Sequence, residues 1–516
     1  MADVTITLTP SNTRAISPWI YGLNFYNGIA NAPPLPTLDR AGGNRWTAYN
    51  WENNASNAGS DYLYESDAYL SSSTTPAEAV RALIAADRAV GAASLVTVQM
   101  QGWVSADENG PASTNNPPDT TRFKPLVFKK SSQTSAAFTT TPSTSDNAVY
   151  MDEFAWALDQ KFAGLGIFGA SAATPTFIEL DNEPELWNST HLEIQGSTPI
   201  SSDAYIAKTI SLTKALKDQF PGMTLLGPVN YGFGGIYSWQ GELGATPSGA
   251  NWFADKYMAA LKAASASYGK PLVDAYDFHW YSEASDPNGT RVTSLNGTSL
   301  TDAQVQAIAQ SPRSLWDPSY SEKSWIHDVL GGPIALLPRL QAKIAAASPG
   351  MKLGITEYNN GGCQHIAGTL AESDNLGIFG AQGVYAANYW PLGNNETFCL
   401  AAFRAFRGFD GASATFGDVA VQANSSNVQS VSAYASTDTA HAGRTVFVAI
   451  NRSTSARQTA FTGLPVSGTA HLYRISVSSA AGQNPVKPVA AGTQAVSGAS
   501  FSVSLPALSV TTIDVF

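Results

Sequence analysis

Between about residues 16 and 400, short runs of β-branched and aromatic residues alternate with longer stretches of helical periodicity. This alternation is typical of a parallel sheet whose strands are joined by crossover helices. The candidate strands are residues 20–25, 44–49, 94–100, 177–181, 225–228, 275–281, 353–356 and 386–390. Eight parallel strands are enough to close a barrel. The sequence therefore predicts an α/β fold built on a (β/α)8 TIM barrel.

Helix signals separate several of these runs. Thr75, Pro76 and Glu78 have the spacing of a capping box at a helix start, and Gly91 follows as a stop. Residues 203–220 and 252–264 also repeat apolar side chains at helical spacing. Residues 101–149 are rich in Thr, Ser, Pro and Asn and exceed an ordinary connection. We expect a functional loop there, over the third strand end, with a small hairpin around residues 123–128.

A different pattern begins after about Phe406, where Ser, Thr and Val alternate in short runs. Period-2 runs at regular spacing predict an appended antiparallel β-sandwich domain. Residues 4–8 alternate in the same way, so we expect the N-terminal strand to join the sandwich. The predicted domains are a barrel over residues 16–405 and a sandwich formed by residues 1–15 with 406–516.

Composition excludes some partners. The net charge is −11, and charged residues make up 13% of the chain, against roughly 25% in a typical domain. A negative surface repels phosphate backbones, and the sequence has no apolar stretch long enough to span a bilayer. We expect a monomer that binds neither nucleic acid nor a membrane. Its neutral, hydrogen-bonding surface resembles that of secreted carbohydrate-active proteins, and we expect an exported protein whose signal peptide has been removed.

The chain contains two cysteines, Cys363 and Cys399. Two are too few for a disulfide framework or a cysteine zinc site. One bridge and two buried free thiols are both consistent with the sequence.

Two carboxylates follow predicted strands. Glu183 comes directly after the run that ends the fourth strand, and Glu357 ends the seventh. Glycoside hydrolysis needs a carboxylic acid and a carboxylate on opposite faces of the sugar, and barrel enzymes keep catalytic groups at strand ends. Asn182 precedes Glu183 and is suited to bind the hydroxyl beside the reacting carbon. A glutamate that is only a solvated loop residue or a helix cap is the alternative for each position taken singly.

Four segments resemble glycoside hydrolase family 44. They are residues 41–53 (AGGNRWTAYNWEN), 179–184 (ELDNEP), 277–281 (DFHWY) and 355–358 (ITEY). The resemblance implies a barrel with an appended sandwich, endo-β-1,4-glucanase or xyloglucanase activity, and a retaining mechanism. It implies Glu183 as acid/base and Glu357 as nucleophile, with no cofactor for catalysis.

Further residues are candidates for the same site. Arg45 is expected to hold Glu357 ionised, with pairing to another acid as the alternative. His279 and Tyr281 end the sixth strand, where we expect Tyr281 to hydrogen-bond Glu357 and His279 to contact the same network. A satisfied core histidine is the alternative for His279. Sugar rings pack on aromatic faces, and the candidate platforms are Trp51, Trp187, Trp325 and Trp390.

Three acids are candidate ligands of a structural Ca²⁺ that the resemblance implies. They are Glu65, Asp152 and Glu153, and oxygen ligands on loops suit this ion. Asp152 and Glu153 also open a predicted helix, where acidic residues favour the N-terminus without any ion.

The leading hypothesis is a secreted endo-acting hydrolase of β-1,4-glucan chains, including cellulose-like, xyloglucan and mixed-linkage polymers. A xylanase or mannanase with the same site is an alternative. A non-catalytic polysaccharide-binding barrel predicts a neutral residue at one strand-end position, and both carboxylates are present. A serine hydrolase predicts a Gly-x-Ser-x-Gly elbow, which the sequence lacks.

Overall fold

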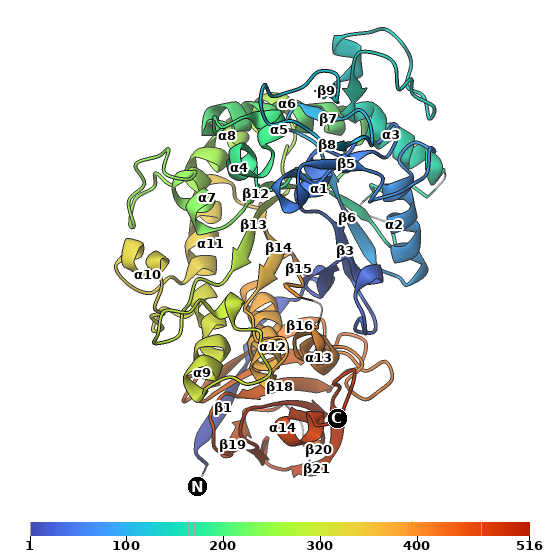
Figure 1. The fold of residues 1–516 in the computed structure, drawn as a ribbon. Helices are drawn as coiled ribbons and strands as arrows, with labels where there is room; N and C mark the ends of the chain where they lie inside the picture. The colour runs from blue at the N-terminus through green and yellow to red at the C-terminus, as the bar shows by residue number, and fades with distance from the viewer. Residues whose placement is uncertain (1, 164, 170–171, 394, 466) are drawn as a thin grey trace. The chain divides into compact units, whose positions relative to one another are not determined.

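The computed structural model describes residues 2–163, 165–169, 172–393, 395–465 and 467–516 (Figure 1). The chain forms two compact units. One consists of the chain up to Thr37 with Tyr281–Arg339 and Glu357–Phe516, and the other of Leu38–Trp280 with Leu340–Thr356. The predicted domain boundaries near residues 15 and 405 remain a prediction.

Eight strands close a barrel in the order β11-β12-β13-β14-β15-β2-β3-β6. They are β2 (Gly22–Asn24), β3 (Leu38–Ala41), β6 (Ala93–Val98), β11 (Thr176–Leu180), β12 (Leu225–Asn230), β13 (Ala275–Tyr281), β14 (Lys352–Asn359) and β15 (Ala386–Tyr389). Neighbours such as β3 and β6, or β6 and β11, pair in parallel. Their side chains are buried along nearly the whole strand, as expected when helices cover a parallel sheet. The predicted TIM barrel is confirmed.

The second strand differs from its prediction. Residues 44–47 form a short helix, α1 (Asn44–Thr47), and the strand is β3, which comes earlier in the chain. β3 reads Leu-Asp-Arg-Ala, so two of its four side chains are charged. Arg40 is nevertheless fully buried because it pairs with the buried Glu179. A strand whose burial depends on an ion pair has no apolar signature in the sequence.

The helices between strands are mostly where periodicity predicts them. The longer ones are α2 (Glu78–Ala89), α3 (Met151–Lys161), α6 (Ser202–Gln219), α8 (Phe253–Tyr268), α9 (Asp302–Gln310), α11 (Leu336–Ala347), α12 (Ile366–Gln382) and α13 (Thr397–Phe406). The shorter ones are α4 (Trp187–Thr190), α5 (Leu192–Gln195), α7 (Phe233–Ser238), α10 (Trp325–Leu330) and α14 (Val477–Ala480). In Figure 1, α2 lies beside β6.

The predicted capping box before α2 does not form. The residue preceding this helix is Ala77, which adopts a left-handed conformation with φ of 57° and makes no side-chain cap. Glu78 instead bonds Arg81 one turn later, at 2.6 and 2.7 Å. The left-handed residue delays the helix start, so the Thr75–Glu78 spacing does not correspond to the cap and third helical positions.

The long segment after β6 contains short strands. β9 (Phe123–Val127) pairs antiparallel with β7 (Trp103–Ser105) and parallel with β10 (Val149–Tyr150), so the expected local hairpin does not form. A second small sheet joins β4 (Ser56–Asn57), β5 (Glu65–Asp67) and β8 (Gly110–Pro111). Lys124 on β9 pairs with buried Glu52 at 2.6 Å and with Asp146 at 2.5 Å. These ion pairs join the middle of the segment to Glu52, which precedes β6 in the chain, and to Asp146 near the segment's own end.

Nine strands form a separate, mostly antiparallel sheet in the order β21-β20-β23-β18-β17-β16-β1-β19-β22. They are β1 (Val4–Ala15), β16 (Val419–Ser425), β17 (Val431–Thr437), β18 (Thr445–Asn451), β19 (Arg457–Thr462), β20 (Gly468–Ser476), β21 (Val489–Val496), β22 (Ser500–Leu505) and β23 (Ser509–Val515). One apolar core collects side chains from all nine strands, including both edges of the order. The sheet therefore curls over a shared core, as in a sandwich.

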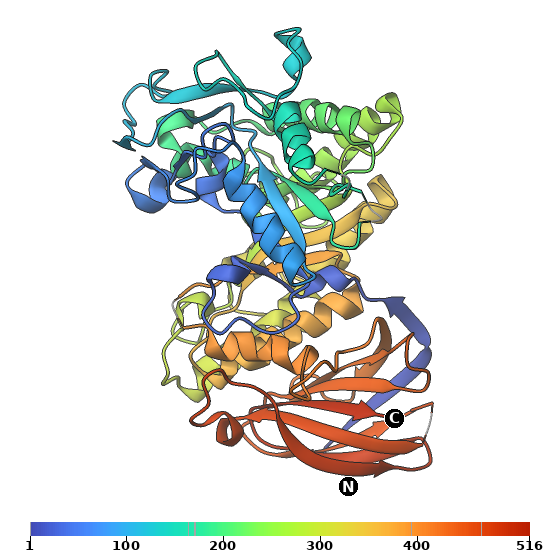
Figure 2. The same cartoon turned by 90° about the vertical axis from the view of Figure 1, so that its right-hand side faces the viewer.

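The N-terminal strand joins this sheet, as its alternation predicts. β1 pairs antiparallel with β16 and parallel with β19. Figure 2 shows β1, in blue, running alongside the red C-terminal strands. Val4, Ile6 and Leu8 on alternate positions enter the common core.

Cys363 and Cys399 form a disulfide, which settles the two alternatives that the sequence left open. The bridge joins the segment after β14 to α13, and both sulfur-bearing residues are buried. Over the described residues, no helix combines the length and apolar character that a membrane crossing requires.

Candidate active site

The chain turns sharply where β11 ends. Asp181 and Glu183 both adopt positive φ, 65° and 42°, which costs a residue other than glycine about 1–3 kcal/mol. The Asp181 carboxylate accepts hydrogen bonds from Thr47 Oγ1 at 2.7 Å, from the backbone N–H of Gln101 at 3.1 Å and from that of Asn182 at 2.8 Å. These contacts hold the strained turn that presents Glu183. Sequence reasoning did not assign Asp181 this role, although it lies within the Asp-Asn-Glu-Pro segment.

Glu183 lies in a mostly buried environment. Its side chain is 16% exposed, and its Oε1 lies 2.8 Å from Nδ1 of His279. Burial is the main cause that raises its pKa from 4.5 to about 7; the charge of Arg40 opposes the rise, and those of Asp61 and Glu179 add to it. Near neutral pH a substantial fraction of Glu183 is therefore protonated.

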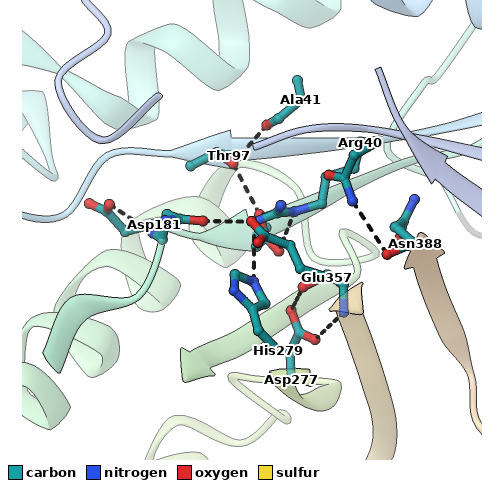
Figure 3. Close-up of polar contacts among 12 residues, drawn as sticks. Arg40, Ala41, Thr97, Asp181, Asp277, His279, Glu357 and Asn388 are labelled. Carbon is teal, nitrogen blue, oxygen red and sulfur yellow. Dashed lines mark hydrogen bonds and ion pairs between the residues drawn. The ribbon is translucent and has the colours of Figure 1, made fainter. Parts of the chain in front are cut away.

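Arg40 is the residue at the centre of this half of the site (Figure 3). Its Nε lies 2.8 Å from both carboxylate oxygens of Glu179, and its Nη2 lies 3.0 Å from Oδ1 of Asn182. Nη2 is also 3.4 Å from Nε2 of His279. Because arginine only donates, Nε2 accepts, and the proton of a neutral imidazole is then on Nδ1, which donates to Glu183. The sequence analysis did not identify Arg40 as a site residue. The one feature that could have indicated it is its position two residues before the Gly42-Gly43 pair.

Asn182 is buried and held on several sides. Its Oδ1 accepts from Arg40, and its Nδ2 donates to Oδ1 of Asn44 at 3.3 Å. Asn44 in turn donates to the Asp61 carboxylate at 2.8 Å. The indole N–H of Trp187 donates to the Asn182 carbonyl at 3.1 Å. The side chain predicted to bind a sugar hydroxyl is therefore fixed beside Glu183.

Glu357 belongs to the other compact unit, near the end of β14. It is 5% exposed, and the hydroxyl of Tyr281 donates to its Oε2 at 2.6 Å. A short hydrogen bond from a hydroxyl stabilises the ionised carboxylate. The predicted contact between Tyr281 and Glu357 is present, whereas His279 contacts Glu183.

Trp325 and Trp390 are accessible aromatic groups. Trp325 begins α10 and is 42% exposed. Trp390 follows β15 and makes an edge contact with Phe25, with ring centroids 4.9 Å apart. Phe25 is itself 37% exposed, so this pair offers an apolar face to solvent.

The structure does not support Trp51 and Trp187 as sugar platforms. Both are completely buried. The Trp51 ring stacks on Phe154 of α3 at a centroid distance of 5.7 Å, and Trp187 makes an edge contact with Tyr205 of α6. Their positions after predicted strands suggested a cleft, but helices of the barrel cover them.

Arg45 also differs from its prediction. Its Nη1 pairs with Asp67 at 2.5 Å and bonds Ser56 Oγ at 3.1 Å, and its guanidinium lies 4.5 Å from the centre of the Tyr69 ring. The arginine thus satisfies the alternative of pairing with another acid. It lines a pocket of about 390 Å³ with Asp61, Tyr62 and Tyr69, and the two tyrosines are 61% and 77% exposed.

The three candidate calcium ligands already have other partners or lie in a strand. Lys130 Nζ lies 2.6 Å from Glu153 Oε1, which also accepts from the backbone N–H of Thr139 at 2.8 Å. Asp152 accepts from the backbone N–H groups of Lys130 and Glu153. Glu65 begins β5. Ca²⁺ needs six to eight oxygen ligands, and an ammonium already balances Glu153, so these residues as placed do not fit a calcium ion.

A closed parallel barrel that presents one glutamate of raised pKa and a second one bonded by tyrosine, each at a strand end, defines a barrel glycoside hydrolase. The model of glycoside hydrolase family 44 matches residues 55–284. A solved family 44 xyloglucanase of Paenibacillus polymyxa, with xyloglucan, is 34% identical, with a TM-score of 0.90 and 99% of each chain covered. The chain belongs to glycoside hydrolase family 44.

Two curated relatives are longer than this chain. Endoglucanase A of Paenibacillus lautus is 40% identical over 450 residues, which are 84% of this chain and 62% of the relative. The β-mannanase/endoglucanase A of Caldicellulosiruptor saccharolyticus is 35% identical over 477 residues, which are 88% of this chain and 34% of the relative. The chain thus spans about three fifths and one third of these proteins.

Proposed function

We propose that this chain is an endo-acting hydrolase that cleaves β-1,4-glucan chains with retention of configuration. The observation that carries the proposal is the contrast between two glutamates at strand ends of one barrel. Burial raises the pKa of Glu183 to about 7, and Tyr281 donates to Glu357. A carboxyl group that keeps its proton near neutral pH, together with a second carboxyl group that accepts a hydrogen bond from a tyrosine, corresponds to the acid and the nucleophile of a retaining glycosidase.

In the first step, protonated Glu183 gives its proton to the glycosidic oxygen. The Glu357 carboxylate attacks the anomeric carbon, the bond to the leaving sugar breaks, and a glycosyl ester forms on Glu357. In the second step, ionised Glu183 takes a proton from water, which attacks the same carbon and releases Glu357 as a carboxylate. The net change is the addition of one water across one glycosidic bond.

The local network supports both roles of Glu183. His279 donates to one carboxylate oxygen and is held in place by Arg40, so the proton for transfer is on the other oxygen. When Glu357 becomes an ester it loses its negative charge. The pKa of Glu183 then falls, because a nearby negative charge disfavours its ionised form. This change favours its second role as a base.

The substrate is proposed as a β-1,4-glucan, including xyloglucan. An endoglucanase and a xyloglucanase among the relatives support this class. Trp325, the Phe25–Trp390 pair and the pocket lined by Tyr62 and Tyr69 are proposed as surfaces for successive sugar rings. One relative is named a β-mannanase/endoglucanase, so mannan is the alternative substrate to be tested.

Export is proposed together with this activity. A polymeric substrate is met outside the cell, and disulfides persist mainly in oxidising compartments. The buried Cys363–Cys399 bridge is consistent with that environment.

The test compares Glu357→Gly and Glu183→Ala variants, with Glu108→Gln at an exposed position as the control. Activity on xyloglucan and carboxymethyl cellulose is expected to fall by several orders of magnitude in both site variants and to stay at the parent level in the control. Xylan and mannan complete the substrate panel and decide between the proposed class and its alternatives.

Azide distinguishes the two roles. With an aryl cellobioside, azide should rescue Glu357→Gly and give the α-glycosyl azide, because azide replaces the nucleophile directly. With Glu183→Ala it should give the β-glycosyl azide, because azide then opens the ester on Glu357. Exchange of the two products would reverse the roles, and full activity in either variant would refute the mechanism.

A further inference from the structure

A groove lies on the nine-stranded sheet, within the unit that holds Glu357 but on other elements. It has a volume of about 410 Å³, within the roughly 300–1,000 Å³ typical of ligand sites. β16 and β17 line it, together with α12, the end of β1 and the segment after the 3-10 helix Ser311–Leu315. These elements supply none of the proposed catalytic groups.

One rim of the groove is a row of amides. Asn12 Nδ2 donates to Oε1 of Gln422 at 2.7 Å, and Gln422 Nε2 contacts Oδ1 of Asn424 at 3.2 Å. The β1–β16 register shifts between Thr9 and Thr13, so Asn12 lies in the irregular part of the strand. All three amides are exposed. Such a row offers donors and acceptors with no net charge.

Trp316 lines the same groove and is half-buried. Its indole nitrogen is buried and, among the described residues, has no hydrogen-bond partner. A buried N–H without an acceptor costs roughly the desolvation penalty of that group, and is uncommon in folded proteins. Because this nitrogen is enclosed, a ligand in the groove would meet the exposed part of the Trp316 ring and not its N–H group.

Gly377 keeps the groove wall flat. A Cβ at this position of α12 would lie 2.0 Å from the ring of Tyr434, so any larger residue would displace that ring. Tyr434 is anchored by its hydroxyl, which donates to Asp374 at 2.6 Å. Glycine inside a helix is less favourable than alanine. Here it allows the ring to lie against the helix backbone where both line the groove.

Two of the residues that line the groove are charged. Arg14 and Asp317 both line it, and Asp317 is already paired with Arg313 at 2.7 Å. Asp317 is therefore not available to a cation, and Arg14 contacts the backbone carbonyl of Gln382 at 3.5 Å. Aromatic rings beside uncharged amides are suited to a ligand with apolar C–H faces and many hydroxyls.

We propose that this groove is a second binding site for a β-1,4-glucan segment, separate from the site at the barrel strand ends. The choice of β-1,4-glucan as the ligand rests on the proposed function. An enzyme that cleaves a polymer is surrounded by that polymer, so the same polymer is the expected ligand of the groove. A polymer held there remains tethered while the barrel cleaves it, which raises the effective concentration of substrate.

Fluorine NMR tests the proposal with the full chain carrying Glu357→Gln, so that cellohexaose is not consumed. The chain has 12 tryptophans, and 5-fluorotryptophan labelling gives each one a signal. A Trp316→Phe variant identifies the signal of Trp316. That signal is expected to shift saturably with cellohexaose and to stay unchanged with maltohexaose, whose α-linkages give a different chain shape.

The double variant Gln422→Ala with Asn424→Ala should weaken binding at the Trp316 signal roughly tenfold, because two hydrogen bonds are lost. Ala381→Glu, an exposed change on the α12 side of the groove, should have a similar effect by blocking it. Gln494→Ala, on the exposed edge strand β21, is the matched control and should change nothing.

If cellohexaose shifts the Trp325 and Trp390 signals and leaves Trp316 in place, the groove is no sugar site and the proposed function stands. If no tryptophan signal responds, the proposed substrate class fails as well. An equal response of Trp316 to maltohexaose would overturn the assignment to β-1,4-glucan.

Discussion

The pH dependence of catalysis tests the acid/base role through a charge that belongs to neither of the two proposed catalytic glutamates. Asp61 is exposed, and its negative charge is among the causes that raise the pKa of Glu183. Asp61→Asn removes this charge and keeps an oxygen to accept from Asn44. The pKa of Glu183 should fall, so the fraction that carries the catalytic proton should fall at neutral pH.

The expected magnitudes follow from the pKa and from the dielectric of water. With a pKa of about 7, the protonated fraction of Glu183 falls from about 0.9 at pH 6 to about 0.1 at pH 8, so kcat/KM of the parent should fall about tenfold. Two unit charges 4 Å apart in water interact by about 1 kcal/mol, which is about 0.7 pKa unit. Because Asp61 is exposed, the basic limb should move to lower pH by some tenths of a unit and not beyond about 0.7.

The assay is kcat/KM on xyloglucan and on an aryl cellobioside between pH 4 and 9 at low ionic strength. Asp203→Asn is the control, because it removes one charge at an 82% exposed side chain at the start of α6. A leaving group of low pKa needs no proton, so the basic limb should flatten for a dinitrophenyl cellobioside. A basic limb that moves to higher pH in Asp61→Asn, or that moves equally in Asp203→Asn, would refute the reasoning.

Three further outcomes follow from buried groups and from the exposed ring pair. Replacing Cys363 and Cys399 by alanine should lower the free energy of unfolding in urea by about 4 kcal/mol, from loop closure over a separation of 36 residues; a loss below about 1 kcal/mol contradicts this. Burial raises the pKa of Glu372 from 4.5 to about 8, so its stabilising effect is complete below pH 4.5 and is lost as pH rises through 8. In Glu372→Gln, Tm should therefore fall less between pH 6 and 9 than it does in the parent. An unchanged dependence of Tm on pH would contradict the raised pKa of Glu372. Trp390→Ala should raise KM for xyloglucan several-fold and leave Tm nearly unchanged; an unchanged KM removes the Phe25–Trp390 pair as a sugar surface.

The barrel was predictable because seven of its strands are apolar runs bounded by turn residues. The second strand was not, since Asp39 and Arg40 make β3 polar in sequence while an ion pair to Glu179 makes it buried in the fold. Partners distant in sequence decide such burial. The same reason explains the small sheet after β6, where β9 pairs with β7 before it and with β10 after it instead of forming a local hairpin.

The positions of the two carboxylates at strand ends could be predicted from the sequence, whereas the residues that contact them could be predicted only in part. A glutamate at a strand end is visible in sequence because strand and turn are local features. Which arginine supports the carboxylates is not local: Arg45 is five residues from Arg40, yet it points to Asp67 and Tyr69. The burial of Trp51 is likewise set by α3, through Phe154.

Arg40 explains how a buried cation can lie near Glu183 without keeping it ionised. Its Nε lies 2.8 Å from both carboxylate oxygens of Glu179, so part of its charge is balanced there, and its remaining effect lowers the pKa of Glu183 less than burial raises it. The group in direct contact with Glu183 is His279, whose Nδ1 lies 2.8 Å from the Glu183 carboxylate. Burial can then dominate and hold the pKa near 7, where one residue can give a proton in one step and take it back in the next. The general acid of a retaining glycosidase needs a pKa in this intermediate range, and a direct Arg40–Glu183 ion pair would lower the pKa out of it.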